Sequence, residues 1–597
     1  MRELLLGNHA VARGAYEAGV SVAAAYPGTP STEIIEALAL YPEIYTEWAP
    51  NEKVALEVAA GAAIGGGRAL AAMKHVGLNV AADPLMTLAY TGVNAGLVVV
   101  SADDPGLFSS QNEQDNRYYA RLAQIPCLEP ADSQEARDFT MLAFDLSERF
   151  DTPVMLRLTT RVAHSYSLVE TGLRQEAGLK DYVKQPPKYV MLPAFGRARH
   201  PLVEERRERL KAYAETAPVN RVEWADRRVG VITAGIAYQY VKEALPGVSV
   251  LKLGLTYPLP EKLVREFAGG VGTCFVVEEL EPFLEEQVRL LGLSVIGKEI
   301  IPRVGELSPA LVAGTVGRRA ALLVPDLAAN WTVRDQALSQ VAAALDLPAR
   351  PPVMCPGCPH RGVFYTLKKL NLVVTGDIGC YTLGASPPLS SMDTCICMGA
   401  SVGMALGMEK ARGRDFARRL VAVIGDSTFL HSGMTGLLDW VYNRGSGTLI
   451  ILDNGTTAMT GHQHHPGTGY TAAGDPTFKV DLEQLVRGLG VSRVRVVDPY
   501  DLDEVEATVK EEVDTAEPSV IIARRSCALL KKEEKGAVCK VDEGSCLGCR
   551  KCLELGCPAL SFVEGQACID ALQCNGCGLC ASVCPSQAIS EAGVVYE

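Results

Sequence analysis

The sequence has little of three features, and each shortage excludes a class of protein. No uncharged apolar run reaches about 18 residues, so no segment is expected to span a membrane. Basic residues are in deficit, with 57 Lys and Arg against 70 Asp and Glu and a formal charge of −13, which argues against nucleic acid as a partner. Low-complexity segments and short repeats are also missing, so ordinary globular domains are expected.

A signal for secretion is missing as well. The apolar stretch in the opening MRELLLGNHA is too short for a signal peptide, so a reducing, cytoplasmic location is expected. The chain has 597 residues, and 48% of them are hydrophobic. It is therefore long enough for roughly three to five domains with sizeable cores.

What the sequence does contain is 18 cysteines, concentrated near its end. Two runs there each close on Cys-Pro, and the second has the spacing of bacterial ferredoxins. The first run holds Cys546, Cys549, Cys552 and Cys557, and the second holds Cys574, Cys577, Cys580 and Cys584. Thiolates in this arrangement predict two [4Fe-4S] clusters, and therefore a protein that handles electrons one at a time.

The last cysteine of each run ligates the other cluster in ferredoxins of this type. One cluster is then expected on Cys546, Cys549, Cys552 and Cys584, and the other on Cys557, Cys574, Cys577 and Cys580. Cys557 departs from the pattern, because the first run has one extra residue before it. Disulfides are disfavoured in a reducing compartment, and zinc ribbons use two CxxC pairs. Cys539 and Cys568 fall outside the pattern and are predicted to be ordinary thiols.

Short apolar strands alternate with helical segments rich in Ala and Gly through most of the chain. This alternation predicts a multidomain α/β fold of doubly wound parallel sheets, ending in a small α+β ferredoxin domain. The predicted divisions are α/β units at 1–165, 227–330 and 350–530, a linker region at 166–226, and the ferredoxin domain at 537–597.

Oxygen ligands follow two strands of the unit at 350–530. The strand Leu420–Ile424 ends in Gly425-Asp426-Ser427, and the strand Thr448–Leu452 ends in Asp453-Asn454. Ligands bind at the carboxyl edge of open α/β sheets, and such oxygens beside a helix N-terminus suit Mg²⁺ with a diphosphate. The alternative is an edge without a ligand, where Asp426 only caps a helix.

This pair of loops resembles the diphosphate motif of thiamine diphosphate enzymes, whose usual form is GDG with NN. Ser427 replaces the second Gly of that motif, and Asp453 replaces the first Asn. The resemblance implies that Gly425 and Ser427 line the cofactor site. It also implies that the Asp426 and Asn454 side chains and the Thr456 carbonyl oxygen hold Mg²⁺.

The first unit offers the other half of such a site. Thiamine diphosphate enzymes place a Glu against the aminopyrimidine ring, and both Glu52 and Glu57 compete for this role. In 2-oxoacid:ferredoxin oxidoreductases the catalytic Glu lies nine positions before a Gly-Ala pair, which favours Glu52. The segment YPGTPSTE resembles the YPITPSS segment of these enzymes, which implies that Thr29 contacts the oxoacid. The alternative reading is a helix N-cap by Ser31 or Thr32.

Several other polar residues remain open between a functional and a structural role. Lys74, His75, Arg117 and Arg121 are candidates to meet a substrate carboxylate, or to be structural or surface charges. His462, His464 and His465 are expected at the rim of the active site, and His462 and His464 are candidates for proton transfer there.

A third set of cysteines raises the question of a third cluster. Similar CPGC and GIGC segments hold a cluster near the cofactor in some 2-oxoacid oxidoreductases, with a distant fourth cysteine. The corresponding residues here are Cys355, Cys358, Cys380 and Cys527, while Cys395 and Cys397 complicate the choice. The alternative is that these thiols only line a close-packed loop.

Taken together, these segments resemble the alpha subunits of indolepyruvate:ferredoxin oxidoreductases, from GNHAVARGAYEAG to the ferredoxin tail. The resemblance implies a pyrimidine-binding first unit, a second unit like the C-terminal domain of transketolase, and a diphosphate- and Mg²⁺-binding third unit. It implies oxidative decarboxylation of aryl-2-oxoacids with coenzyme A, and ferredoxin as the electron acceptor. It also implies a smaller beta subunit, in a heterodimer or a dimer of heterodimers.

The sequence leaves several points open. Pyruvate, phenylpyruvate or another 2-oxoacid would serve the same chemistry, and the physiological direction and the coenzyme A site are undetermined. An electron-transfer subunit without catalysis would not need Asp426, Asn454 and Glu52 together. A non-oxidative thiamine-dependent decarboxylase would have no use for the ferredoxin tail.

Overall fold

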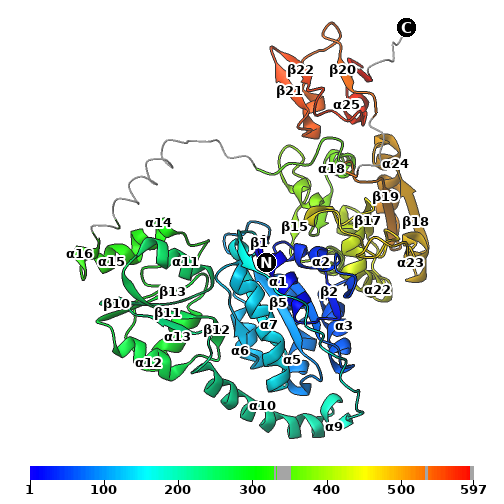
Figure 1. Cartoon of the computed structure of the whole chain (residues 1–597). Coiled ribbons are helices and arrows are strands. Elements are labelled where there is room, and N and C mark those ends of the chain that lie inside the picture. Colours follow the sequence, from blue (N-terminus) through cyan, green and yellow to red (C-terminus); the bar gives the residue numbers. More distant parts are fainter. Residues whose placement is uncertain (329–330, 332–350, 531–535, 592–597) are drawn as a thin grey trace. The chain divides into compact units, whose positions relative to one another are not determined.

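The computed structural model describes residues 1–328, 331, 351–530 and 536–591. The chain divides into two compact units, Met1–Pro348 and Ala349–Glu597. Mainly parallel sheets with helices on their faces make up most of both units, and small antiparallel sheets complete the second (Figure 1). This confirms the predicted α/β fold class. Residues 592–597, at the end of the predicted ferredoxin domain, lie outside the described part.

The first unit contains a seven-stranded sheet with the order β12, β6, β7, β5, β4, β2, β3. Its parallel strands are β2 (Val22–Ala25), β3 (Tyr45–Trp48), β4 (Ala69–Lys74), β5 (Leu97–Asp103), β6 (Cys127–Leu128) and β7 (Val154–Thr159). Every residue of β5 and β7 is buried, as expected for parallel strands covered on both faces. The helices that pack around this sheet include α1 (Gly7–Glu17), α3 (Glu52–Ile64), α5 (Ala82–Thr91) and α7 (Ser133–Phe150).

A second, four-stranded sheet in the same unit has the order β13, β10, β11, β9. Its parallel strands are β10 (Asp226–Ala234), β11 (Val248–Leu253) and β13 (Thr273–Val277). The next strand after β11 is β12 (Leu255–Tyr257), which leaves this sheet and pairs antiparallel with β6 of the first. The regions predicted as 1–165 and 227–330 are therefore joined through a shared sheet.

The region predicted as a linker, 166–226, contributes strands to its neighbours. β8 (Tyr166–Glu170) pairs antiparallel with β1 (Arg2–Leu6) at the start of the chain. β9 (Arg221–Glu223) forms the antiparallel edge of the second sheet. Between them lies α10 (Pro193–Ala214), which is mostly exposed but buries Val203, Arg206, Leu210 and Ala214. These pairings fix the ends of the region, so it is more than a passive connection.

The second unit is built on a six-stranded, fully parallel sheet with the order β15, β14, β16, β17, β19, β18. Its strands are β14 (Val373–Gly376), β15 (Thr394–Cys395), β16 (Leu420–Gly425), β17 (Thr448–Asp453), β18 (Arg493–Val497) and β19 (Ser519–Arg524). β16 and β17 are direct neighbours, with Gly425 opposite Leu452. Their carboxyl ends therefore open onto the same edge of the sheet.

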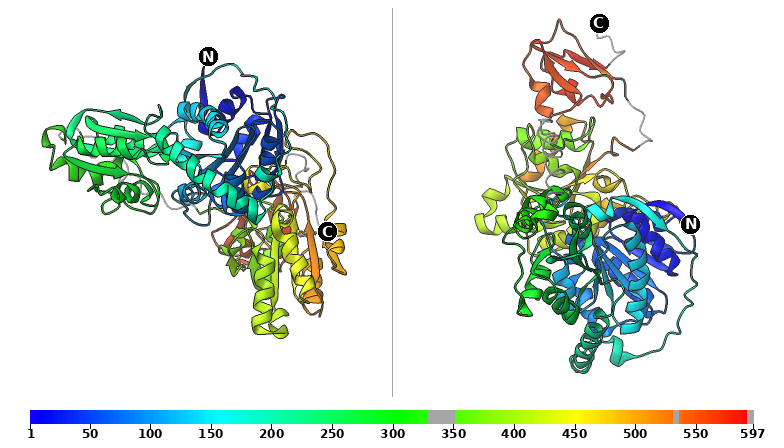
Figure 2. Two further views of the ribbon diagram at one scale, coloured as in Figure 1. Left: turned by 90° about the horizontal axis from the view of Figure 1, so that it is seen from below. Right: turned by 60° about the vertical axis from the view of Figure 1, so that its left-hand side comes forward.

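The cysteine-rich end of the chain forms a small lobe of the second unit, drawn in orange and red in Figures 1 and 2. Two antiparallel pairs frame it, β20 (Cys539–Val541) with β23 (Ile589–Glu591) and β21 (Leu560–Val563) with β22 (Gln566–Ile569). Its core is small and includes several of the cysteine side chains, so metal clusters would supply much of its interior.

Candidate functional site

Two loops of the second unit meet at the carboxyl edge of its sheet. Asp426 follows β16 and is buried, with 3% of its surface exposed. Its Oδ2 accepts a hydrogen bond from the Gly455 N–H at 2.8 Å, and its Oδ1 accepts one from the Ser427 N–H at 2.8 Å. Because Gly455 belongs to the loop after β17, this carboxylate ties the two loops together.

Asn454 and Thr456 lie on the same loop and are also buried. The Asn454 Oδ1 accepts a hydrogen bond from the Thr456 N–H at 3.2 Å, and the Thr457 hydroxyl donates to the Ser427 Oγ at 2.9 Å. At Gly425, a Cβ would lie 2.7 Å from the Tyr381 ring, so a side chain is excluded there. Carboxylate, amide and carbonyl oxygens are the ligands that Mg²⁺ prefers, so this donor set fits the predicted metal site.

Asp426 begins a helical stretch whose backbone changes pitch. α21 (Asp426–Thr428) leads into a π-helical segment at Phe429–Gly433 and then into α22 (Met434–Tyr442). Such π segments within helices are frequent at functional sites. The first turn of this stretch offers backbone N–H groups at the edge where the oxygen ligands gather, which suits an anionic phosphate.

Two histidines flank these loops, and neither is one of the two candidates for proton transfer, although His465 belongs to the group expected at the rim. The His465 Nε2 lies 3.3 Å from the Asp426 Oδ2, and the His360 Nε2 lies 3.4 Å from the Asn454 Nδ2. Burial lowers the pKa of His360 to about 4, with Asp426 opposing the shift only in part, so its ring is neutral at pH 7. His464 instead packs against Tyr470, with ring centroids 5.2 Å apart.

The sequence contains a signal for both histidines. His360 lies two positions after the CPGC segment, behind Pro359. His465 is the last histidine of the GHQHHP loop, where three candidates compete at similar spacing. Only the fold of that loop decides which ring reaches Asp426.

The cysteines that could hold a third cluster lie near one another beside the same loop. Burial, followed by the neighbouring thiols of Cys527 and Cys355, raises the pKa of Cys380 to about 11. Cys355 and Cys380 likewise influence the buried Cys358 thiol, whose pKa burial raises to about 12. The Cys527 N–H donates to the Asn454 carbonyl oxygen at 3.0 Å, so this set adjoins the predicted diphosphate loop.

The two other cysteines of this region behave differently. The Cys395 thiol donates to the Asp377 carbonyl oxygen at 3.4 Å, and Cys397 is exposed. The pKa of Cys380 responds to Cys527 and Cys355 and to neither of these two thiols. Cys527 is therefore the better fourth member of the set.

In the first unit, Glu52 occupies the first position of α3. The Asn51 side chain caps this helix by accepting a hydrogen bond from the Val54 N–H at 3.0 Å. Glu52 is 4% exposed, and its carboxyl group packs on Gly77, where a Cβ would lie 2.5 Å from the Glu52 Oε1. Glu57 is exposed and pairs with Lys53 at 3.1 Å, as a surface residue would. The structure thus separates the two competing glutamates by burial.

The YPGTP turn follows β2 at the carboxyl edge of the first sheet. The Ser31 hydroxyl donates to the Gly28 carbonyl oxygen at 2.8 Å, and the Thr32 Oγ1 accepts from the Gly28 N–H at 3.1 Å. Neither side chain caps α2 (Thr32–Leu38), so the N-cap reading of this segment is wrong. Both hydroxyls instead hold the turn closed around the half-buried Thr29.

Lys74 adjoins both of these features. A Cβ on Gly28 would lie 3.1 Å from the Lys74 Cγ and Cδ, so the lysine chain runs along the YPGTP turn. Its Nζ donates to the Ser109 carbonyl oxygen at 2.7 Å. Burial lowers the pKa of Lys74 to about 8, against the opposing charges of Asp104 and Glu52. His75 is fully buried, and its Nε2 lies 3.1 Å from the Asn112 carbonyl oxygen.

Arg117 has the structural role that the sequence left open. It is 1% exposed, and its guanidinium donates to Asp115 and, at 2.8 Å, to Glu278, which directly follows β13. A guanidinium whose N–H groups already bind buried carboxylates has no donors left for a substrate carboxylate. Arg121 lies one turn further along α6 (Arg117–Ala123) and is half-buried.

The cysteines of the two terminal runs line two separate cavities. One is lined by Cys546, Cys549, Cys552 and Cys584, and the other by Cys557, Cys574, Cys577, Cys580 and Cys539. Each cavity thus holds one of the predicted ligand sets, with members from both runs, although cluster binding itself stays a prediction. The second cavity contains an additional thiol, Cys539, for which the spacing gave no signal.

The wall of this second cavity is shared with the CPGC segment. Pro356, Gly357 and Arg361 line it together with the cysteines. The Arg361 guanidinium donates to the Leu555 carbonyl oxygen at 2.5 Å and to the Cys355 carbonyl oxygen at 3.0 Å. Arg361 therefore connects the third cysteine set with the ferredoxin lobe.

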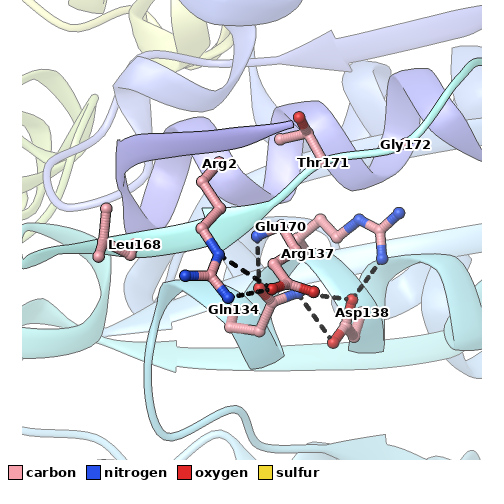
Figure 3. A pocket seen from close by; sticks show the side chains of 8 residues that line it. All are labelled: Arg2, Gln134, Arg137, Asp138, Leu168, Glu170, Thr171 and Gly172. Atoms are coloured by element: carbon pink, nitrogen blue, oxygen red, sulfur yellow. Dashed lines mark hydrogen bonds and ion pairs between the residues drawn. The ribbon is translucent and has the colours of Figure 1, made fainter.

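A further hollow lies between β1, β8 and α7 and is shown in Figure 3. Its charged side chains pair with one another, Arg2 with Glu170 at 2.9 Å and Arg137 with Asp138 at 2.5 Å. None of the residues predicted to act in catalysis or cofactor binding lines it. Among the described residues, none of the helices is both long and apolar enough to cross a membrane.

Three family models match the chain. The model described as pyruvate flavodoxin/ferredoxin oxidoreductase, thiamine diphosphate-binding, matches residues 13–216, which include Thr29 and Glu52. The C-terminal TPP binding domain of thiamine pyrophosphate enzymes matches residues 377–523, which include Asp426 and Asn454. A 4Fe-4S binding domain matches residues 567–590.

Curated relatives extend over nearly the whole chain. Indolepyruvate oxidoreductase subunit IorA of Archaeoglobus fulgidus is 42% identical over 98% of this chain and 97% of its own. The same subunit of Pyrococcus horikoshii is 42% identical over 98% of this chain and 96% of its own. The 2-oxoglutarate synthase subunit KorA of Methanothermobacter thermautotrophicus is 26% identical over 50% of this chain and 93% of its own.

Proposed function

The chain belongs to the family of the IorA subunits of indolepyruvate oxidoreductases, and from this we propose that it oxidises aryl-2-oxoacids such as indolepyruvate. Thiamine diphosphate and [4Fe-4S] clusters are its cofactors. In the proposed reaction, the oxoacid, coenzyme A and two oxidised ferredoxins give the aryl-acetyl-CoA, carbon dioxide, two reduced ferredoxins and a proton. When bound, thiamine diphosphate supplies the electron sink for decarboxylation.

The observation that carries this proposal is the contact between the loop after β17 and the third cysteine set. The Cys527 N–H donates to the Asn454 carbonyl oxygen at 3.0 Å. A site for a cofactor adduct that must lose two electrons, one at a time, thus adjoins thiols that suit a one-electron carrier. A non-oxidative decarboxylase would have no use for this arrangement.

The residues of the second unit have the role of holding the diphosphate. Asp426, the Asn454 side chain and the Thr456 carbonyl oxygen are the proposed Mg²⁺ ligands, and Gly425 and Ser427 line the cofactor. Their support is the burial of the three ligands and the hydrogen bond from the Gly455 N–H that fixes the Asp426 carboxylate. A carboxylate held in this way needs no rearrangement to meet a metal ion.

The residues of the first unit have the role of positioning the aminopyrimidine ring and the oxoacid. Glu52 is proposed to donate and accept the proton at that ring, and Thr29 to contact the oxoacid. The support for Glu52 is its burial at the head of α3, with its carboxyl group against Gly77. A glycine at that position leaves room for the Glu52 carboxyl group to lie at the head of the helix.

The partners of the chain are proposed from its family. A smaller beta subunit, in a heterodimer or a dimer of heterodimers, is expected because the curated relatives are named as subunits. Ferredoxin is the proposed electron acceptor, and coenzyme A the proposed acyl acceptor. Coexpression with the beta subunit is therefore needed before activity is measured.

The decisive experiment measures reduction of ferredoxin or a viologen dye by the coexpressed enzyme with coenzyme A. Indolepyruvate, phenylpyruvate and pyruvate are compared in parallel, and the acyl-CoA product is identified by mass spectrometry. Aryl substrates are expected to give the higher kcat/KM. A preference for pyruvate would assign the same chemistry to another 2-oxoacid, and reduction without coenzyme A consumption would overturn the acylating reaction.

Cys355, Cys358, Cys380 and Cys527 are proposed to hold a third [4Fe-4S] cluster. Iron analysis of the wild-type chain is then expected to give about twelve iron atoms, four for each cluster, and Cys380→Ala about eight. The matched control is Cys397→Ala, because Cys397 is exposed. About eight iron atoms in the wild-type chain would show that these thiols bind no cluster.

Lys74 is proposed to receive the carboxylate of the oxoacid. Removing its charge by Lys74→Met is expected to raise the KM for the oxoacid about tenfold to a hundredfold, since hydrogen bonds to charged groups contribute about 1.5–3 kcal/mol. Lys74→Arg should restore part of the loss. Lys53→Met is the control, because Lys53 is exposed and pairs with Glu57. An unchanged KM with a lowered melting temperature would assign Lys74 a structural role only.

A further inference from the structure

The cavity that holds Cys557, Cys574, Cys577 and Cys580 also contains a fifth thiol, that of Cys539. A [4Fe-4S] cluster has four iron atoms and takes one cysteine for each. Cys539 stands outside the two ferredoxin runs, and its surface is only 2% exposed. The predicted cluster needs no fifth cysteine ligand, so a different role has to be found for the buried Cys539 thiol.

The fold holds this thiol in place. Cys539 is the first residue of β20, where it lies opposite Glu591 of β23. Its side chain lies within interaction distance of that of Cys580, which lines the same cavity. The contact is therefore directed at one member of the ligand set.

The direction of a hydrogen bond between these two sulfurs follows from cluster chemistry. A cysteine that ligates iron is a thiolate and has no proton to donate, so in the loaded protein Cys539 must be the donor. A donor to a ligating sulfur withdraws negative charge from the cluster. This stabilises the reduced, more negative state and raises the reduction potential.

We propose that Cys539 remains a thiol, donates a hydrogen bond to the Cys580 sulfur, and raises the reduction potential of the cluster in this cavity. The proposal rests on the proposed function, because it requires that the clusters are present. The other cavity has a donor of a different kind, since the Ser586 Oγ lies 3.6 Å from the Cys584 Sγ. Removing the Cys539 thiol should therefore shift the reduction potential of one cluster and leave that of the other unchanged.

The main alternative is that Cys539 is itself a ligand in place of Cys557. Cys557 departs from the ferredoxin spacing by one residue, so it is the ligand most open to replacement. The two possibilities predict different results when Cys539 is removed. A donor can be lost without loss of iron, whereas the loss of a ligand would remove iron or convert the cluster to a three-iron form.

The test uses the full chain coexpressed with its partner subunit. Wild type, Cys539→Ala, Cys539→Ser and Cys568→Ala are compared by iron analysis and by redox titration followed with EPR spectroscopy. Cys568→Ala is the matched control, because Cys568 is exposed on β22 of the same lobe.

Cys539→Ala is expected to keep its iron and to make one cluster about tenfold harder to reduce, a shift of about 59 mV to more negative potential. Cys539→Ser keeps a hydrogen-bond donor, so its reduction potential should shift less. The potential of Cys568→Ala should equal that of the wild type. An unchanged potential in Cys539→Ala, or loss of iron from both Cys539 variants, would overturn the proposal. A wild-type chain that binds no clusters would instead overturn the proposed function itself.

Discussion

Replacing Glu52 with glutamine is expected to lower kcat by a factor of about 10²–10⁴, the range that a general acid–base group contributes. The amide keeps the size of the side chain, so its fit against Gly77 at the head of α3 is retained. What it loses is the ability to exchange a proton with the aminopyrimidine ring. The measurement is dye reduction under saturating oxoacid and coenzyme A, together with hydrogen–deuterium exchange at C2 of bound thiamine diphosphate.

Glu57→Gln provides the matched control for this experiment. Both glutamates lie on α3, but Glu57 is exposed and pairs with Lys53, so its replacement should change kcat less than twofold, since an exposed ion pair contributes at most about 1 kcal/mol and only to stability. Iron content should stay at the wild-type value in both variants. If Glu57→Gln caused the larger loss, the assignment of Glu52 would be wrong.

Replacing Asp426 with alanine is expected to weaken the Mg²⁺-dependent binding of thiamine diphosphate by at least about a hundredfold. Replacing a residue that hydrogen-bonds to a metal ligand lowers metal affinity by about 10–100-fold, and replacing a direct ligand should lower it further. The loss also frees the Gly455 N–H, so the loop after β17 is no longer tied to β16. The measurement is calorimetric titration with thiamine diphosphate in the presence of Mg²⁺, and again with EDTA.

The control for Asp426 lies on the same helical stretch. Asp439 is exposed on α22, and Asp439→Ala should bind the cofactor like the wild type. EDTA should weaken binding to the wild type but change little in Asp426→Ala, because the metal site is already lost. Equal cofactor affinity in Asp426→Ala and the wild type would contradict the assignment of this ligand.

Local patterns were sufficient for much of the fold. The strands that end at Gly425 and Asp453 are where their apolar runs predicted them, because parallel strands buried on both faces must be continuously apolar. The cysteine runs predicted two ligand sets, and each set lines a cavity of its own. Cluster ligands are close in sequence, so their spacing carries most of the information about their arrangement.

Two other features depend on contacts that residue type and composition do not indicate. Ser31 and Thr32 have the residue types of an N-cap, but both hydroxyls bind Gly28 and hold the turn. The region at 166–226 is polar and irregular in composition, yet its ends pair with β1 and β11, which composition does not reveal. Hydrogen bonds within the turn determine the role of the two hydroxyls, and strand pairing determines the structure at the ends of the region 166–226.

By itself, the sequence determined the α/β class, the two ferredoxin runs and the oxygen-rich loops after β16 and β17, because each depends on residues that are neighbours along the chain. Three contacts are visible only in the tertiary structure. The Arg117 guanidinium binds Glu278, the His465 ring lies beside Asp426, and Cys539 lies in the cavity of a complete set of predicted cluster ligands. Each of these contacts joins residues tens of positions apart or more. Whether residues so far apart in the sequence come into contact depends on how whole sheets and loops pack, and the spacing of neighbouring residues does not indicate it.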